Sequence, residues 1–240
     1  MLPLSIFRER QFSATNAVTF IVYGALSGAI FLLPLVLQVS AGYSPLASGV
    51  ALLPLTFIML ALSARSGRLA TRIGPRLQLS LGPVVVGAGV AALAFSTLGS
   101  TYVVFTLPAI VVLGLGLAFT VAPLTATAMS SAPAQHSGIA SAFNNDVARV
   151  GGLLAVAVLP ALTGITGAAY LHPEVLAAGF RTAVLASGAL CLTGGLLAVA
   201  TITNPRRQRR PAQTPAPECL HCGLEAPPLT IGGSQTLDRN

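Results

Sequence analysis

A short arginine-rich segment, residues 66–76 (SGRLATRIGPR), lies between two long apolar runs of the sequence. Together with Arg65 just before it, Arg68, Arg72 and Arg76 recur every three or four residues, which is the spacing of one helical face. Gly74-Pro75 then supplies a residue that can adopt positive φ and a ring without an amide hydrogen, so we expect the helix to stop there. A compact cationic loop between two apolar helices is typical of the cytoplasmic side of a membrane protein. The segment therefore predicts two transmembrane helices joined by a cytoplasmic loop.

The composition indicates that the rest of the chain also lies in a membrane. Only 8% of the residues are charged and 54% are hydrophobic, with a mean hydropathy of +0.80, whereas a soluble domain carries roughly 25% charged residues. We therefore expect an integral membrane protein whose main partner is the lipid bilayer. The net charge of +7 comes from arginines, since the chain has no lysine. Their gathering in predicted cytoplasmic segments favours membrane topology over nucleic-acid binding.

Six apolar runs are long enough to cross a hydrocarbon core about 30 Å thick. The predicted spans cover residues 13–38, 45–64, 77–98, 102–129, 139–165 and 181–202. Residues 1–12 read as a cytoplasmic amphipathic segment, 13–203 as a six-helix transmembrane domain, and 204–240 as a disordered cytoplasmic tail. The predicted outer loops hold no arginine, so the charge asymmetry places both termini in the cytoplasm. The expected fold is an all-α polytopic protein of the plasma membrane.

Several sequence strings resemble one known family. GRLATRIGPR is similar to the G-x-x-x-D-R-x-G-R-R signature of the major facilitator superfamily, in the copy found in the second half of its fourteen-helix drug:proton antiporters. Gly67, Arg72, Gly74 and Arg76 match that pattern, whereas Thr71 stands where the family has an acid. Further matches follow in the family's order: NxxTFxxYGAL, QVSAGYSPLASGVALLP, VAPLTATAM and SGIASAFNNDVARVGGLLAVAVLP. The resemblance covers about residues 2–203.

The resemblance implies a fold and a function. The fold would be half of a major facilitator fold, a 3+3 inverted repeat of six helices, corresponding to the C-terminal half. The function would be efflux of small hydrophobic or cationic compounds by alternating access with proton antiport. The second wall of the pathway would come from a homodimer or from a separate N-terminal transporter half. The alternative is a transporter remnant, or a membrane partner without transport of its own.

Two charges within the fifth predicted span form the first candidate site. A charged side chain at the centre of a bilayer costs roughly 2.5–3.5 kcal/mol, so Asp146 and Arg149 must neutralise each other, snorkel inward or face a cavity. We interpret Asn145 and Arg149 as lining the mouth of a cavity and Asp146 as the candidate for proton coupling. The alternative is a charge pair at the point where the helix enters the membrane.

A polar stripe on the first span forms the second candidate site. Asn16, Tyr23 and Ser27 share one helical face, and such a stripe avoids lipid. It could line a substrate pathway, or it could hydrogen-bond to another helix. Gly24-x-x-x-Gly28 on the same helix predicts a close approach of a neighbouring helix. For the arginine loop, a gating contact with the other half competes with a purely topological role.

Enzymatic and metal sites are not expected. Cys219-Leu220-His221-Cys222 has the spacing of half a zinc site, but zinc takes four ligands and no second pair follows. The sequence has no phosphate-binding loop and no paired-carboxylate metal site, and its three histidines fall in predicted loops or in the tail. We therefore predict a protein without a cofactor that is not an enzyme.

Overall fold

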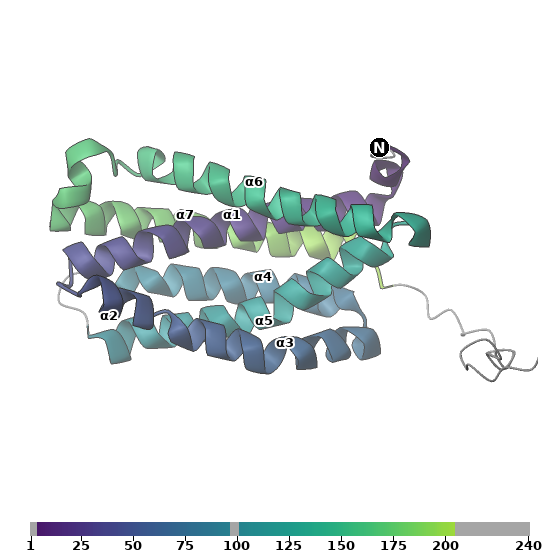
Figure 1. The fold of residues 1–240 in the computed structure, drawn as a ribbon, viewed down its shortest axis with the longest axis horizontal. Helices are drawn as coiled ribbons and strands as arrows, with labels where there is room; N and C mark the ends of the chain where they lie inside the picture. Colours follow the sequence, from purple (N-terminus) through teal and green to yellow (C-terminus); the bar gives the residue numbers. More distant parts are fainter. Residues whose placement is uncertain (1–3, 97–100, 205–240) are drawn as a thin grey trace, which may run out of the picture. The chain divides into compact units, whose positions relative to one another are not determined.

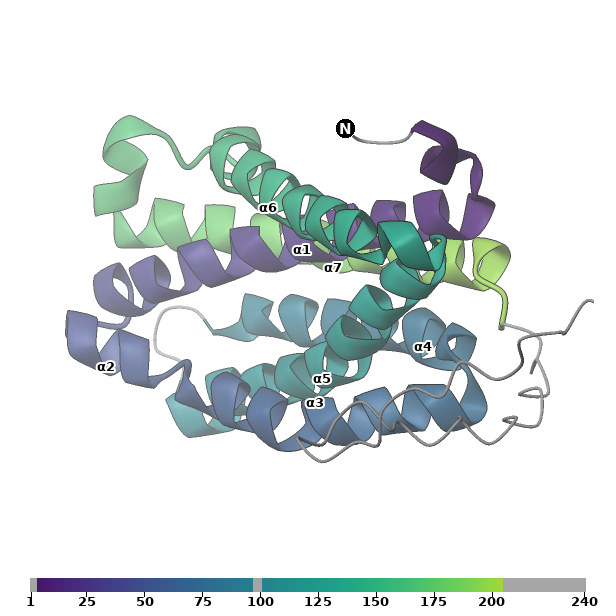
Figure 2. The same cartoon turned by 45° about the vertical axis from the view of Figure 1, so that its right-hand side comes forward.

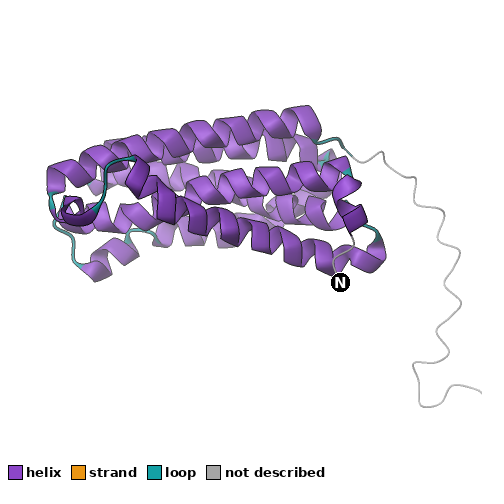
Figure 3. Ribbon diagram, turned by 90° about the horizontal axis from the view of Figure 1, so that it is seen from above, coloured by secondary structure: helices purple, strands orange, loops and turns teal. Residues whose placement is uncertain are grey.

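The computed structural model describes residues 4–96 and 101–204, and every regular element within those ranges is a helix (Figures 1 and 3). These residues belong to one compact unit that ends at Asn204. The predicted tail, with its Cys219 and Cys222, lies outside the described residues. The helices in chain order are η1 (Leu4–Arg8), α1 (Arg10–Val39), α2 (Pro45–Val50), α3 (Leu53–Ile73), α4 (Pro75–Ala92), η2 (Leu93–Phe95), η3 (Tyr102–Thr106), α5 (Leu107–Ser130), η4 (Ala134–His136), α6 (Ser137–Leu162), η5 (Gly167–Leu171) and α7 (Pro173–Thr201).

Six helical stretches among the described residues are long and apolar enough to cross a membrane, which confirms the predicted all-α polytopic fold. They are Arg10–Val39, Pro45–Ala70, Pro75–Phe95, Tyr102–Ser130, Ser137–Leu162 and Pro173–Thr201. The prediction was wrong about where the last span begins, because α7 starts at Pro173 and Arg181 lies more than two turns inside it. The helix-start signals are local: a proline in the first turn, where its missing amide costs nothing, and Glu174 near the positive end of the helix dipole.

The packing of the six spans repeats itself. The first span, α1, packs on α6 and α7; the fourth, α5, packs on α3 and α4; and α4 packs on α7. Exchanging the first span with the fourth, the second with the fifth and the third with the sixth leaves this set of contacts unchanged. Successive spans cross in opposite directions, so the exchanged helices run antiparallel. This is the arrangement of a 3+3 inverted repeat.

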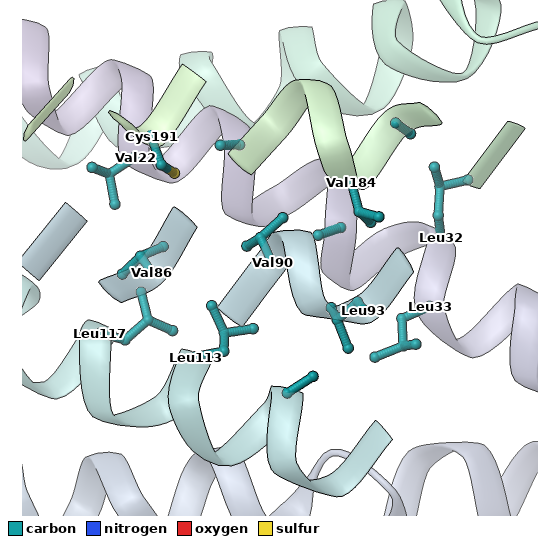
Figure 4. Close-up of a cluster of buried hydrophobic side chains, with 14 of the residues drawn as sticks. Val22, Leu32, Leu33, Val86, Val90, Leu93, Leu113, Leu117, Val184 and Cys191 are labelled. Atoms are coloured by element: carbon teal, nitrogen blue, oxygen red, sulfur yellow. The ribbon is translucent and has the colours of Figure 1, made fainter. Parts of the chain in front are cut away.

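The core lies where α1, α4, α5 and α7 meet (Figure 4). Its fully buried side chains are almost all aliphatic, and they include Val22, Val86, Leu113 and Val184. Glycines let the backbones touch at the crossing of α4 and α7. A methyl group at Gly87 would lie 2.8 Å from the Gly188 carbonyl oxygen, and one at Gly188 would lie 2.9 Å from that of Gly87.

The segments predicted to be cytoplasmic meet at one end of the unit. The Gln11 side chain donates to the Thr203 carbonyl (3.2 Å) and accepts from the Thr203 hydroxyl (2.9 Å), which ties the start of α1 to the end of α7. The loop between α3 and α4 reaches the same place, because the Arg76 amide donates to Asn204 Oδ1 (3.0 Å). Figure 2 shows the α3–α4 turn and the end of α7 at the same end of the bundle.

Two helices are left largely uncovered. Only 11% of the second span and 17% of the fifth are buried, against 44–61% of the other four. These two spans exchange under the internal symmetry, and each packs mainly on one partner, α3 on α5 and α6 on α1. The unit therefore presents long faces of α3 and α6 to its surroundings.

Candidate functional site

The contact between α1 and α6 contains a buried polar cluster. Asn144 of α6 donates from one amide nitrogen to Thr19 Oγ1 (2.7 Å) and to Asn16 Oδ1 (3.1 Å) of α1. Asn16 in turn donates to the carbonyl of Phe12 (2.9 Å), and Thr19 donates to the carbonyl of Thr15 (2.9 Å). Since Asn16, Thr19 and Asn144 are all buried, these bonds join the two helices in a place that water and lipid do not reach.

Small residues bring the same two helices together further along. A methyl group at Gly24 would lie 3.3 Å from the Gly151 carbonyl oxygen, and one at Gly151 would lie 2.8 Å from that of Phe20. A methyl group at Gly152 would lie 2.6 Å from Ser27 Oγ. The close approach predicted for this side of α1 is confirmed, and its partner is α6.

Three polar side chains of α6 point away from this contact. Asn145, Asp146 and Arg149 are exposed, and none of them forms a hydrogen bond or ion pair with another described residue. Their spacing places Asn145 and Arg149 on one face with Asp146 beside them. The exposed stripe continues through apolar residues, including Val150 and Leu153.

The depth of the charges in α6 limits what they can face. The helix has 26 residues and is about 39 Å long, against about 30 Å for a hydrocarbon core. Asp146 lies about 14 Å from the first residue of the helix and Arg149 about 18 Å. Both are more than two turns inside the helix. Facing lipid at the centre of a bilayer would cost roughly 2.5–3.5 kcal/mol for each charge, so a covering of water or another polypeptide would stabilise this part of the stripe.

The structure separates the predicted pathway residues into two groups. Asn16 and Ser27 lie in the α1–α6 contact, and Tyr23 is half-buried against the main core. Asn145 and Arg149 lie on the other side of α6 and do not meet them. The roles assigned to all five in a substrate pathway, and to Asp146 in proton coupling, stay predictions.

The arginine loop turns at Gly74, in a backbone conformation that needs glycine. Gly74 ends α3 with φ +89° and ψ 153°, a conformation that is essentially restricted to glycine. A Cβ there would collide with the Asn204 side chain. Arg76 donates to the Val199 carbonyl of α7 (3.0 Å), while Gly67 faces Ala122 of α5. The loop is thus fixed between α3, α4 and the end of α7.

Sequence reasoning missed three polar residues. Asn144 directly precedes the predicted Asn145. It lies seven residues, or two helical turns, before Gly151, and this spacing indicates that it shares the small-residue face of α6. Gln78 donates to the carbonyl (3.2 Å) and hydroxyl (3.1 Å) of Ser66 across the loop, a contact without a local signature. Asn204 was assigned to the tail, but it accepts the Arg76 amide.

Comparison with known proteins identifies the family. The family model described as Major Facilitator Superfamily matches residues 2–156. The chain belongs to the major facilitator superfamily. It is 36% identical over 166 residues to the tetracenomycin C resistance and export protein of Streptomyces glaucescens, covering 68% of this chain and 30% of that protein.

Other relatives carry similar names. The multidrug resistance protein Stp of Mycobacterium tuberculosis is 29% identical over 175 residues, covering 73% of this chain and 32% of Stp. The methylenomycin A resistance protein of Streptomyces coelicolor is 27% identical over 208 residues, covering 87% of this chain and 42% of that protein. The chain thus spans less than half the length of these relatives. The comparisons place it in a family of transporters rather than of enzymes.

No group of three or more metal-ligating side chains occurs within residues 4–96 and 101–204.

Proposed function

We propose that this chain is one six-helix half of a drug exporter, corresponding to the C-terminal half of the fourteen-helix drug:proton antiporters. It works in the plasma membrane by alternating access, with both termini in the cytoplasm. The names of the relatives support export of drugs. The arginine loop lies where the start of α1 meets the end of α7, and its positive charge supports cytoplasmic termini.

One observation carries the proposal: Asp146 and Arg149 are exposed more than two turns inside α6, and neither has a partner among the described residues. Ionisable groups held at that depth usually mark a substrate or proton pathway. In the proposed cycle, Asn145 and Arg149 line the mouth of a water-filled cavity, and Asp146 binds and releases the coupling proton. The substrate is a small hydrophobic or cationic compound.

The second wall of that cavity comes from another six-helix unit. The uncovered faces of α3 and α6 suit this contact, because they leave room for a facing pair of helices and bear the charges that lipid would disfavour. The second unit is either another copy of this chain or a separately made N-terminal half.

Accumulation of a cationic hydrophobic dye in cells that lack their own exporters tests the transport claim. Cells that contain the chain with its second unit are expected to accumulate less dye than cells without it, and Asp146→Asn should restore accumulation. Arg10→Gln, which removes a charge at the start of α1, is the control and should leave export unchanged. Equal accumulation with and without a properly inserted chain and its second unit would contradict the proposal.

Disulfide crosslinking tests the pairing. With Cys219 and Cys222 replaced by serine, Leu153→Cys on the exposed stripe of α6 should form a disulfide under mild oxidation, either with Leu153→Cys of a second copy or with a cysteine introduced on the facing surface of a separate half. Leu185→Cys, exposed near the middle of α7, should stay uncrosslinked. If Leu153→Cys links two copies of this chain, the unit is a homodimer.

The alternative function is a membrane partner without transport of its own. The same uncovered faces of α3 and α6 favour it, since they would serve for docking whether or not a substrate passes. Crosslinking at Leu153 in cells whose dye accumulation does not respond to the chain would support this alternative.

A further inference from the structure

An apolar groove lies directly beside the arginine loop, where α3 ends and α4 begins. It has a volume of about 240 Å³ and lies between α3, α4 and α5. Its walls include Leu69 and Ile73 of α3, Leu77, Leu81 and Val85 of α4, and Phe119 of α5. Leu77 and Leu81 are more than half exposed, at 53% and 57%, so the groove opens at the surface of the bundle.

The loop arginines border this groove in register with its walls. Arg68 immediately precedes Leu69, Arg72 precedes Ile73, and Arg76 precedes Leu77. The three turns of α3 and α4 nearest the loop therefore each carry both a wall residue and an arginine.

Arg72 and Arg76 have no counterion among the described residues. Arg72 is exposed and forms no hydrogen bond or ion pair with another described residue. Arg76 donates one hydrogen bond to the Val199 carbonyl. A guanidinium has five N–H groups, so further donors of Arg76 stay available. The acids within the described ranges are Glu9, Asp146 and Glu174, and none of them forms an ion pair with Arg72 or Arg76.

The depth of the groove matches one leaflet. From Leu77 to Val85 the wall of α4 extends about 12 Å along the helix, close to half of a hydrocarbon core about 30 Å thick. An acyl chain in the groove would start at the loop, where its headgroup would meet the arginines. Apolar packing alone would not select a lipid, because lipid tails surround every helix. The selecting feature is the charge.

We propose that this groove is a binding site for one anionic phospholipid. A single acyl chain lies against Leu77, Leu81 and Phe119, and the phosphate is held by Arg72 and Arg76. Guanidinium groups suit this role, because they bind phosphate oxygens through two parallel hydrogen bonds. The site is separate from the stripe on α6, and it does not depend on transport by the chain.

A second groove provides an internal comparison. It lies between α1, α6 and α7 and has a volume of about 340 Å³. The internal symmetry relates these three spans to the three that form the first groove. Leu162 is part of its wall. Neither groove has a charged side chain in its wall, but only in the first groove do arginines directly precede wall residues in the sequence. We expect the second groove to accept lipid tails without preference for the headgroup.

Fluorescence quenching by brominated lipids tests the proposal. The full chain contains no tryptophan, so Leu81→Trp places a single fluorophore in the groove at an exposed position. The protein is reconstituted in phosphatidylcholine vesicles that contain a minor fraction of brominated phosphatidylglycerol or of brominated phosphatidylcholine. A cationic residue near the membrane surface contributes about 1 kcal/mol to anionic-lipid binding, so Arg72→Gln should lower the relative affinity for phosphatidylglycerol about fivefold.

The controls separate a bound lipid from general attraction to a positive protein. Arg10→Gln removes the same charge from the same end of the unit and should leave the preference intact. In a second single-tryptophan protein, Leu162→Trp, both brominated lipids should quench equally. Equal quenching of Leu81→Trp by the two lipids would overturn the proposal. A loss of preference as large in Arg10→Gln as in Arg72→Gln would also overturn it.

Discussion

The crossing of α4 and α7 offers a sharp test of the packing, because its two glycines meet through backbone atoms. In Gly87→Ala the new methyl group would lie 2.8 Å from the Gly188 carbonyl oxygen and 3.0 Å from Cys191 Cβ. A backbone oxygen cannot move aside by changing rotamer. The two helices must therefore separate, and this separation loosens the packing of the aliphatic core around Val86 and Val184 (Figure 4).

Two opposing effects set the magnitude. Overpacking a well-packed interior costs about 1–3 kcal/mol, while replacing a glycine within a helix by alanine recovers about 0.5–1 kcal/mol. We therefore expect Gly87→Ala to lower the free energy of unfolding by about 0.5–2 kcal/mol. Gly188→Ala should behave alike, because its contacts mirror those of Gly87. The double variant should cost less than the sum, since helices that have separated for one methyl group accommodate the second.

The assay is unfolding of the purified chain in mixed micelles with increasing sodium dodecyl sulfate, followed by helical circular dichroism. Gly138→Ala is the matched control, because a methyl group at Gly138 would meet nothing within 4 Å. That substitution should leave stability unchanged or raise it slightly. A Gly87→Ala protein as stable as Gly138→Ala would refute the close crossing of α4 and α7.

Two further substitutions probe the polar contacts. Asn144→Leu removes the amide that donates to Asn16 and Thr19. In the same micelle assay it should lower the free energy of unfolding by roughly 1 kcal/mol, the usual size for interhelical hydrogen bonds in membranes. No change in that free energy would show that these bonds do not hold α1 to α6. Gly74→Ala forces alanine into a glycine conformation against Asn204 and should cost about 1–3 kcal/mol; a stability equal to that of the unmodified chain would contradict the observed turn.

The sequence predicts the spans well because hydropathy and length determine which segments can cross a bilayer. All six appear, and α3 ends at Gly74 as its positive φ and the following proline require. The error at the last span has a physical cause. Arg181 was taken as the boundary because it is charged. The helix instead begins at local start signals, with Pro173 in its first turn and Glu174 near the positive end of the helix dipole.

The rotation of each helix is harder to predict than its existence. Hydropathy shows that a segment is buried in lipid or protein, but packing decides which face turns to a neighbour. Asn144 and Asn145 are adjacent in sequence, yet one is buried against α1 and the other is exposed. The stripe of Asn16 and Ser27 was identified, but its partner α6 became visible only when the small residues Gly151 and Gly152 were placed opposite it.

The central claim is that the charged stripe of α6 faces a water-filled cavity beside a second unit rather than lipid. Reaction of one introduced cysteine with a membrane-impermeant thiol reagent in native membranes tests it most directly, with Cys219 and Cys222 replaced by serine and the buried Cys191 left in place. The account predicts that Leu153→Cys reacts readily, whereas Leu185→Cys, at a comparable depth on α7, is protected by lipid. Protection of both positions to the same degree would contradict it.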